Sequence, residues 1–199
     1  PAGLFTAYTR AKYGYRPSLL ERGGDMDERD RAVDRFWNGG ALDPECNIQF
    51  GEGGAGAYSD GKLTTRIGDA LCETVLKTLA EHGAPADIAW RQKPHVGTDL
   101  LRGIIRSIRQ EIIALGGEVR FNTALTGLKI ENGALASVET TAGDFACEQL
   151  ILAVGHSARD TFAMLHGSGL PLECKPFSVG FRAEHLQTEI DKSLYHAAA

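Results

Sequence analysis

Apolar side chains recur with a helical period in three stretches of the chain. Residues 4–14 place Leu4, Phe5 and Tyr8 near one face, and Gly14 follows as a stop signal. A second stretch begins after residue 68 and ends at Gly83. The third runs from residue 98 to Gly116 and carries the widest apolar face, formed by Leu101, Ile104, Ile105, Ile108, Ile112 and Ile113. The pattern predicts three helices, the last of them lying on a sheet.

Other stretches have the pattern of strands. The short apolar run before Glu21 and the run at 118–123 predict strands, the second of them parallel. Residues 124–146 alternate around Asn132-Gly133, which indicates a hairpin or small meander. Residues 148–154 are almost wholly apolar and run into Gly155, which is typical of a buried parallel strand that ends at a ligand crevice.

The opening of the chain resembles the second half of a dinucleotide-binding unit. A glycine at the mouth of a helix, Gly3, is followed by a strand that ends in an acid, Glu21, 18 positions later. In such a unit the helix N-terminus, here Pro1, Ala2 and Gly3, faces a pyrophosphate. The acid accepts hydrogen bonds from ribose hydroxyls, which makes Glu21 and its neighbour Arg22 candidate binding residues.

The two earlier glycines and the buried first strand of this unit are absent before Pro1. We therefore expect the chain to be an N-terminally truncated fragment that does not fold stably alone, because a central strand buries several side chains worth about 1.5–3 kcal/mol each. An ordinary helix that begins Pro-Ala-Gly is the alternative interpretation of the opening.

A second glycine cluster spells G-x-G-x-x-G at Gly51, Gly53 and Gly56. No apolar helical period follows it, so the context of a dinucleotide fingerprint is missing and an irregular loop is predicted. Backbone N–H groups in such a loop are suited to wrap a pyrophosphate or flavin; the alternative is a plain surface loop. The candidate contacts here are Gly51, Gly53, Gly54, Ala55, Gly56, Ser59, Asp60, Lys62 and Leu63.

Composition and charge limit the classes of partner that we expect the protein to bind. The formal net charge is −5 with Lys and Arg scattered, which argues against nucleic acid. The four cysteines are far apart and the histidine spacings match no metal site, so we expect reduced thiols and no metal. No apolar run approaches the roughly 20 residues of a membrane span. These features favour a cytoplasmic protein without a membrane partner.

Several longer stretches resemble one family over essentially the whole chain. They are PAGLFTAYTRAKYGYRPSLLERG, FGEGGAGAYSDGKLTTR, KPHVGTDLLRGIIRSIRQEIIALGGEVRFNT, LILAVGHSARDTF and KPFSVGFRAEH. The stretches are similar to those of the bacterial FAD-dependent, or NAD(FAD)-utilising, dehydrogenases, which have a glutathione-reductase-like FAD domain.

The resemblance implies an α/β fold: a Rossmann-like FAD-binding domain with a parallel sheet and a small β meander, here without its first strand. It places that domain at residues 1–170 and the start of a substrate domain, truncated at its C-terminus, at 171–199. It also implies that Ala124 and Leu125 pass the adenine with their backbone groups. Gly155 would then permit close approach to the FAD, with His156 beside it.

The function expected from these features is an FAD-dependent oxidoreductase that passes hydride or electrons between bound FAD and an unknown small substrate or NAD(P)H. A single-Rossmann NAD-linked dehydrogenase and a non-catalytic flavin- or nucleotide-binding module are the alternatives. The sequence assigns no catalytic acid or base, no substrate and no oligomeric state, because proximity in space is not visible in it.

Overall fold

The computed structural model describes residues 1–59, 61–65, 67–90 and 94–196. Six α-helices, five strands and two 3-10 turns are present in these residues. In chain order they are α1 (Ala2–Lys12), β1 (Ser18–Leu20), α2 (Met26–Trp37), η1 (Ala55–Tyr58), α3 (Leu71–Glu81), η2 (Ala86–Ala89), α4 (Thr98–Ala114), β2 (Glu118–Arg120), β3 (Leu125–Glu131), β4 (Ala134–Thr140), β5 (Gly143–Ala146), α5 (Arg159–Gly167) and α6 (Gln187–Tyr195).

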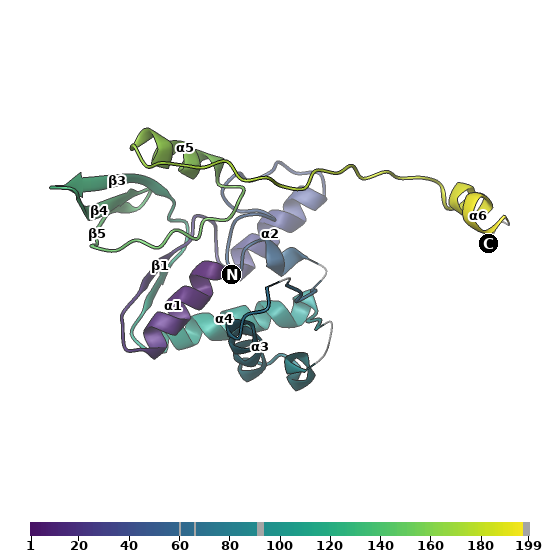
Figure 1. Ribbon diagram of the computed structural model, residues 1–199, viewed down its shortest axis with the longest axis horizontal. Coiled ribbons are helices and arrows are strands. Elements are labelled where there is room, and N and C mark those ends of the chain that lie inside the picture. The colour runs from purple at the N-terminus through teal and green to yellow at the C-terminus, as the bar shows by residue number, and fades with distance from the viewer. Residues whose placement is uncertain (60, 66, 91–93, 197–199) are drawn as a thin grey trace.

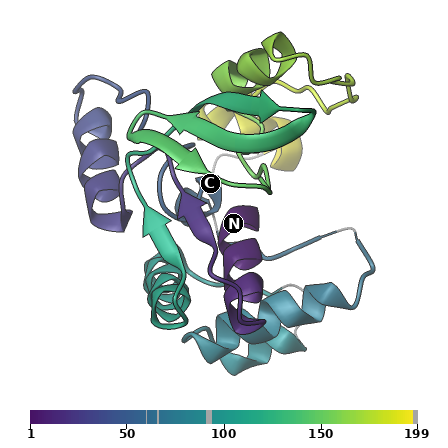
Figure 2. The same cartoon turned by 90° about the vertical axis from the view of Figure 1, so that its left-hand side faces the viewer.

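Strands β1 and β2 pair in parallel, with Leu19 opposite Val119. Helices α1 and α4 pack against each other and against this pair, as Figures 1 and 2 show. The apolar face of α4 is buried as its period predicts, with Ile108 and Ile112 fully enclosed, although Ile113 is half exposed. Leu4 and Tyr8 of α1 join the same core. The core therefore holds the end of β1 in a fixed position relative to the start of α1.

Strands β3, β4 and β5 form a separate antiparallel meander. Asn132 and Gly133 both have positive φ, at 52° and 79°, as the turn of a tight hairpin requires. Helix α5 packs against β3 above the body in Figure 1. The predicted mixed α/β architecture, a parallel pair with a small meander, is confirmed.

The strand predicted at residues 148–154 is wrong. The structure gives these residues no strand, and Ile151 and Leu152 are 56% and 41% exposed. An apolar run becomes a strand only where a neighbour supplies ladder hydrogen bonds. In the part of the chain that the structure describes, no strand lies alongside this segment.

Helix α2 was not predicted, because seven of its twelve residues, MDERDRAVDRFW, are charged and hide its narrow apolar stripe. Asp25 begins the helix by accepting a hydrogen bond from the N–H of Glu28. Met26, Arg29, Ala32 and Val33 form the buried stripe.

Beyond α5 the chain leaves the body as an extended segment that leads to α6 (Figure 1). Phe177, Val179 and Phe181 in this segment are 76–100% exposed. The division of the chain at residue 170 stays a prediction. Among the described residues, no helix is long and apolar enough to cross a membrane.

Candidate functional site

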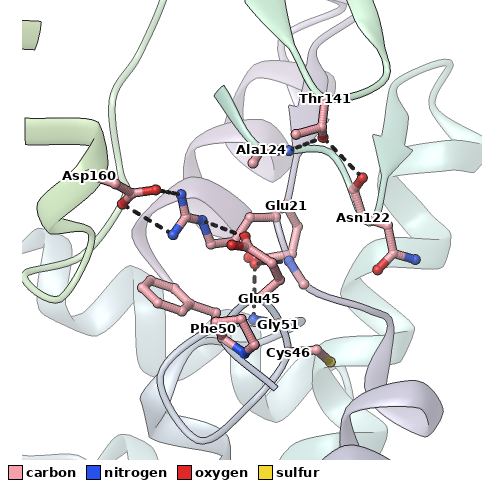
Figure 3. Close-up of polar contacts among 12 residues, drawn as sticks. Glu21, Glu45, Cys46, Phe50, Gly51, Asn122, Ala124, Thr141 and Asp160 are labelled. Atoms are coloured by element: carbon pink, nitrogen blue, oxygen red, sulfur yellow. Dashed lines mark hydrogen bonds and ion pairs between the residues drawn. The ribbon is translucent and has the colours of Figure 1, made fainter. Parts of the chain in front are cut away.

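The carboxylate of Glu21 lies at the end of β1 and organises the turn that follows. Its Oε1 accepts hydrogen bonds from the N–H of Gly23 at 3.0 Å and of Gly51 at 2.9 Å (Figure 3). Its Oε2 makes no hydrogen bond to the described residues. Glu21 therefore joins β1 to the second glycine cluster and keeps one carboxylate oxygen for a further donor.

The second glycine cluster is an irregular loop, as predicted, with only the short turn η1 inside it. The buried carboxylate of Glu52 fixes one side of this loop. Its Oε2 accepts from the N–H of Met26 at 2.9 Å, and its Oε1 lies 3.0 Å from Nε of Arg109. Burial raises the pKa of Glu52, while the Met26 N–H and Arg109 act in the opposite direction. The loop is thus anchored to the start of α2 and to α4.

The loop also touches the start of α1. Gly54 has a φ of +64°, and a Cβ on it would lie 2.8 Å from Cδ of Pro1. A side chain at Gly3 would meet Cδ1 of Leu19 at 3.3 Å and Cβ of Ala153 at 3.6 Å. The approach at Gly54 needs glycine, whereas a Cβ at Gly3 would make a tight contact with Leu19. The two approaches bring the first turn of α1, the loop and the segment before Gly155 together.

Arg22 forms a second bridge across this region. Its guanidinium is paired with both carboxylate oxygens of Asp160, lies 3.5 Å from Oε2 of Glu45 and sits 4.6 Å from the ring centre of Phe50 (Figure 3). The hydrogen bond from Arg22 lowers the pKa of Asp160 against a smaller opposing effect of burial. The end of β1 is thereby held against the start of α5.

The chain after β2 passes the same turn. The N–H of Asn122 donates to the oxygen of Gly23, and the N–H of Thr123 donates to the oxygen of Glu21, both at 2.9 Å. Ala124 is close by and buried, but its N–H already donates to Oγ1 of Thr141 at 3.0 Å. Any backbone contact from Ala124 to a cofactor would have to use its carbonyl oxygen, which also accepts from the N–H of Thr141 at 3.0 Å. The adenine contact predicted for Ala124 and Leu125 stays a prediction.

His156 is exposed and follows Gly155, which has a φ of +74° and open space around it. Its Nδ1 lies 3.3 Å from Oγ of Ser157, and Ser157 donates to Oε1 of Gln49 at 3.1 Å. The segment that follows Gly155 therefore contacts the loop at residue 49 as well as Arg22.

The structure does not bring the end of the predicted loop to this region. Ser59 bonds to the oxygen of Gly56 at 2.8 Å, whereas Lys62 and Leu63 pair with residues 94–96. Asp60 lies outside the described residues. The predicted contacts that do converge are Pro1, Gly3, Glu21, Arg22, Gly51, Gly54 and Ala124. Gly155 has no neighbour within 4 Å of its Cβ position, although Ala153 before it lies near Gly3.

Three polar residues of this region were missed by the sequence analysis: Arg29, Glu52 and Thr141. A signal existed for Arg29, because it occupies a core position between Met26 and Val33 in α2. Glu52 and Thr141 carry no such signal, since their partners, the N–H groups of Met26 and Ala124 and the side chain of Arg109, are brought near only by the fold.

Two cavities lie outside this convergence of backbone. One, of about 330 Å³, is lined by Glu28, Arg31, Ala32, Arg35, Asp43, Cys46 and Asn122. The other, of about 710 Å³, lies against β4 and β5 of the meander. None of the residues predicted to contact a cofactor lines either cavity. The candidate site is therefore defined by converging backbone groups rather than by an enclosed volume.

Residues 102–198 match the family model of FAD dependent oxidoreductases. An uncharacterized protein of Clostridium beijerinckii is 50% identical over 195 residues, which are 98% of this chain and 37% of that protein. The chain thus spans little more than a third of the length of this curated relative.

Among solved structures, the chain is similar to glycine oxidase from Bacillus cereus, with a TM-score of 0.49 and 13% identity over 82% of this chain and 56% of that one. It is also similar to L-amino acid deaminase from Proteus myxofaciens, with a TM-score of 0.42 and 15% identity over 85% of this chain and 46% of that one.

Proposed function

We propose that this chain forms the dinucleotide-holding part of an FAD-dependent oxidoreductase. The observation that carries the proposal is the convergence of the Glu21 carboxylate, the first turn of α1 and the glycine loop at 51–56. The match of residues 102–198 to the FAD dependent oxidoreductase model supports the same cofactor from a different part of the chain.

The residues at this point fit the chemistry of FAD. The free Oε2 of Glu21 is an acceptor for ribose hydroxyls. The N–H groups of Gly53 and Ala55 make no hydrogen bond to the described residues. These two residues flank Gly54, which lies against Pro1 at the start of α1, and the N–H groups of the first turn of α1 also favour an anion. Glycine at 54 keeps the loop backbone close to α1 where any Cβ would collide.

When bound, FAD supplies the two-electron chemistry. The residues of this chain would hold its dinucleotide half: Glu21 orients the ribose, the loop and α1 neutralise the pyrophosphate, and the Arg22–Asp160 pair holds the α5 segment against that end. The electron donor that we propose is NADH or NADPH, with the substrate bound by parts of the protein beyond the described residues.

The test is an anaerobic absorbance titration of the full-length protein that carries this chain. After reconstitution with FAD we expect the flavin bands, and we expect NADH or NADPH to bleach them. Bands that bleach with dithionite but with neither nicotinamide would contradict the proposed donor and leave FAD binding intact. A protein that takes up no FAD would overturn the proposed function.

A further inference from the structure

Arg29 is the most deeply buried charged side chain of the described residues, with no exposed surface. It projects from the apolar stripe of α2, and no carboxylate forms an ion pair with it among the described residues. Its guanidinium lies 4.7 Å from the ring centre of Tyr58. Burial lowers its pKa, yet an arginine stays charged in proteins. A buried positive charge without a carboxylate partner requires an explanation.

All three guanidinium nitrogens of Arg29 donate to backbone oxygens of the segment that contains the glycine loop. Nε donates to the oxygen of Asn47 and one NH₂ group to that of Ile48, both at 2.8 Å. The other NH₂ group donates to the oxygens of Glu52 at 2.6 Å and Gly54 at 2.9 Å. The loop is therefore wrapped around the guanidinium with its carbonyl groups turned inwards.

This wrapping decides where the N–H groups of the loop point. In a trans peptide the C=O of one residue and the N–H of the next point in opposite directions. Because the carbonyls of Glu52 and Gly54 face Arg29, the N–H groups of Gly53 and Ala55 face away from it. Neither N–H group makes a hydrogen bond to the described residues. Two unused donors thus lie on the outer side of a loop that has a positive charge at its centre.

We propose that Arg29 is the positioning residue of the dinucleotide site: it turns the loop carbonyls inwards, aims the N–H groups of Gly53 and Ala55 at the pyrophosphate, and supplies a buried positive charge behind them. This inference rests on the proposed binding of FAD. It assigns to Arg29 an effect on the pyrophosphate without direct contact, and it explains why the charge has no carboxylate partner.

The experiment compares Arg29→Gln with Arg31→Gln in the full-length protein. Arg31 is two positions further along α2, is exposed and makes no hydrogen bond or ion pair with the described residues, so it is the matched control. Each apo-protein is titrated with FAD, with ADP and with adenosine, and its folding is checked by circular dichroism and thermal unfolding. ADP and adenosine differ only in the pyrophosphate.

Arg29→Gln should weaken FAD and ADP by about tenfold or more, since charge-assisted hydrogen bonds are lost, and adenosine by less than about threefold. Arg31→Gln should leave all three affinities unchanged. Arg29→Lys should recover only part of the loss, because an ammonium lacks the planar fork that serves four carbonyls.

An ADP affinity within about threefold of the wild type in folded Arg29→Gln would overturn the inference, and so would an equal loss for adenosine and ADP.

If the Arg29 variants do not fold, the Gly51→Ala variant is titrated in their place. A methyl group at residue 51 would lie 2.5 Å from Cδ of Arg29 and displace it, whereas Gly143→Ala places a methyl group at a similar φ, 108° against 117°, in open space. The same selective loss of ADP binding is expected for Gly51→Ala alone, and equal behaviour of the two glycine variants would contradict the inference.

Failure of the inference is distinguishable from failure of the proposed function. A wild-type protein that binds neither FAD nor ADP contradicts the proposed function itself. A wild-type protein that binds FAD while Arg29→Gln binds it equally well contradicts the role of Arg29 alone.

Discussion

At its N-terminal end, helix α1 lies against the backbone of the glycine loop at 51–56. Gly54 approaches Pro1 so closely that a Cβ would lie 2.8 Å from Cδ of Pro1, and Gly51 donates to the carboxylate of Glu21. Donors remain without a partner there among the described residues, namely the N–H groups of Gly53 and Ala55.

At its C-terminal end the same helix contacts the side chains of Glu111 and His82. Lys12 lies 3.2 Å from Oε1 of Glu111, and Nε2 of His82 lies 2.8 Å from Oε2 of the same carboxylate. Nδ1 of His82 lies 2.7 Å from the oxygen of Thr78, and the rings of Tyr8 and His82 meet edge to face. Both ring nitrogens of His82 and both carboxylate oxygens of Glu111 therefore have partners.

The two ends of α1 therefore differ in role: the N-terminal end is suited to bind a ligand, and the C-terminal end stabilises the fold. Polar groups that are satisfied within the chain stabilise the packing of α1, α3 and α4 and offer little to a ligand. Backbone donors held in place without partners have the opposite property, because the fold has already positioned them for an anion. Substitutions at the N-terminal end should therefore change cofactor affinity, and those at the C-terminal end should change stability.

The largest effect is expected from Glu21→Ala. Removing the carboxylate takes away the ribose acceptor and the hydrogen bonds to Gly23 and Gly51, so FAD affinity should fall by about 10–100-fold. Flavin content and the dissociation constant of the full-length protein measure this loss. Glu118→Ala on the neighbouring strand removes only an ion pair with Arg120 and is the control. Full flavin occupancy in Glu21→Ala would contradict a binding role for the N-terminal end of α1.

Gly54→Ala should act on the same end with a smaller effect. A φ of +64° with a ψ of −171° is a backbone region that only glycine adopts readily, so a side chain at residue 54 costs about 1–3 kcal/mol. Its Cβ would also collide with Cδ of Pro1 and push the loop away from α1, so FAD affinity should fall about tenfold. Gly133→Ala, at a φ of +79° in the β3–β4 turn with no neighbour near its Cβ, is the control for a side chain at positive φ. Titration with FAD should separate the two variants, and equal affinities would contradict a role for loop 51–56.

Glu111→Gln tests the opposite end. Burial by itself raises the pKa of Glu111, but the bonds from Lys12 and His82 outweigh it and lower that pKa. A carboxylate with a lowered pKa stabilises the fold above its unfolded pKa of about 4.3 and loses this contribution as the pH falls from there through the lower pKa of the folded state. We expect Glu111→Gln to destabilise the protein by at most about 1 kcal/mol near neutral pH, with FAD affinity unchanged.

The pH dependence of the stability of Glu111→Gln gives a more specific test. The stability difference between wild type and Glu111→Gln, measured by denaturant unfolding, should shrink as the pH falls from neutral to below about 4. A difference that grows in acid, or a loss of FAD affinity in this variant, would erase the distinction between the two ends of α1.

The smallest effect is expected from Asp160→Asn. Asp160 is 61% exposed in its pair with Arg22, and exposed ion pairs contribute about 0–1 kcal/mol. FAD affinity should change by less than about threefold, because the pair bridges side chains and leaves the backbone donors in place. A loss as large as that of Glu21→Ala would show that the α5 segment is itself part of the binding surface.

Periodicity in the sequence was enough to find α1, α3, α4 and the meander. Helices α1 and α4 bury a regular apolar face and the meander has a specific turn, whereas α3 buries Thr78 and Leu79 and leaves Leu71 and Val75 exposed. Periodicity failed for α2, whose buried stripe includes a charged residue, Arg29. It also failed at 148–154, where an apolar run has no strand beside it among the described residues. In both places the outcome depends on groups distant in the chain.

The residues of the candidate site also divide into those that a local sequence signal predicts and those that it does not. Glu21 and the glycine loop could be predicted, because an acid after a strand and clustered glycines are local signals. Arg29 and Glu52 could not be assigned a role, because their partners are loop carbonyls and the N–H that starts α2. The loop end at Lys62 and Leu63 was misplaced, since its pairing with residues 94–96 is long-range.

The most direct test of the account is amide hydrogen exchange of the full-length apo-protein, measured with and without FAD. If this end of α1 and the glycine loop hold the dinucleotide, FAD should slow exchange at residues 51–56 and in the first turn of α1. Exchange around His82 and Glu111 should not change. Equal protection at both ends of α1, or none at residues 51–56 while FAD is bound, would contradict the assignment of this end as the dinucleotide site.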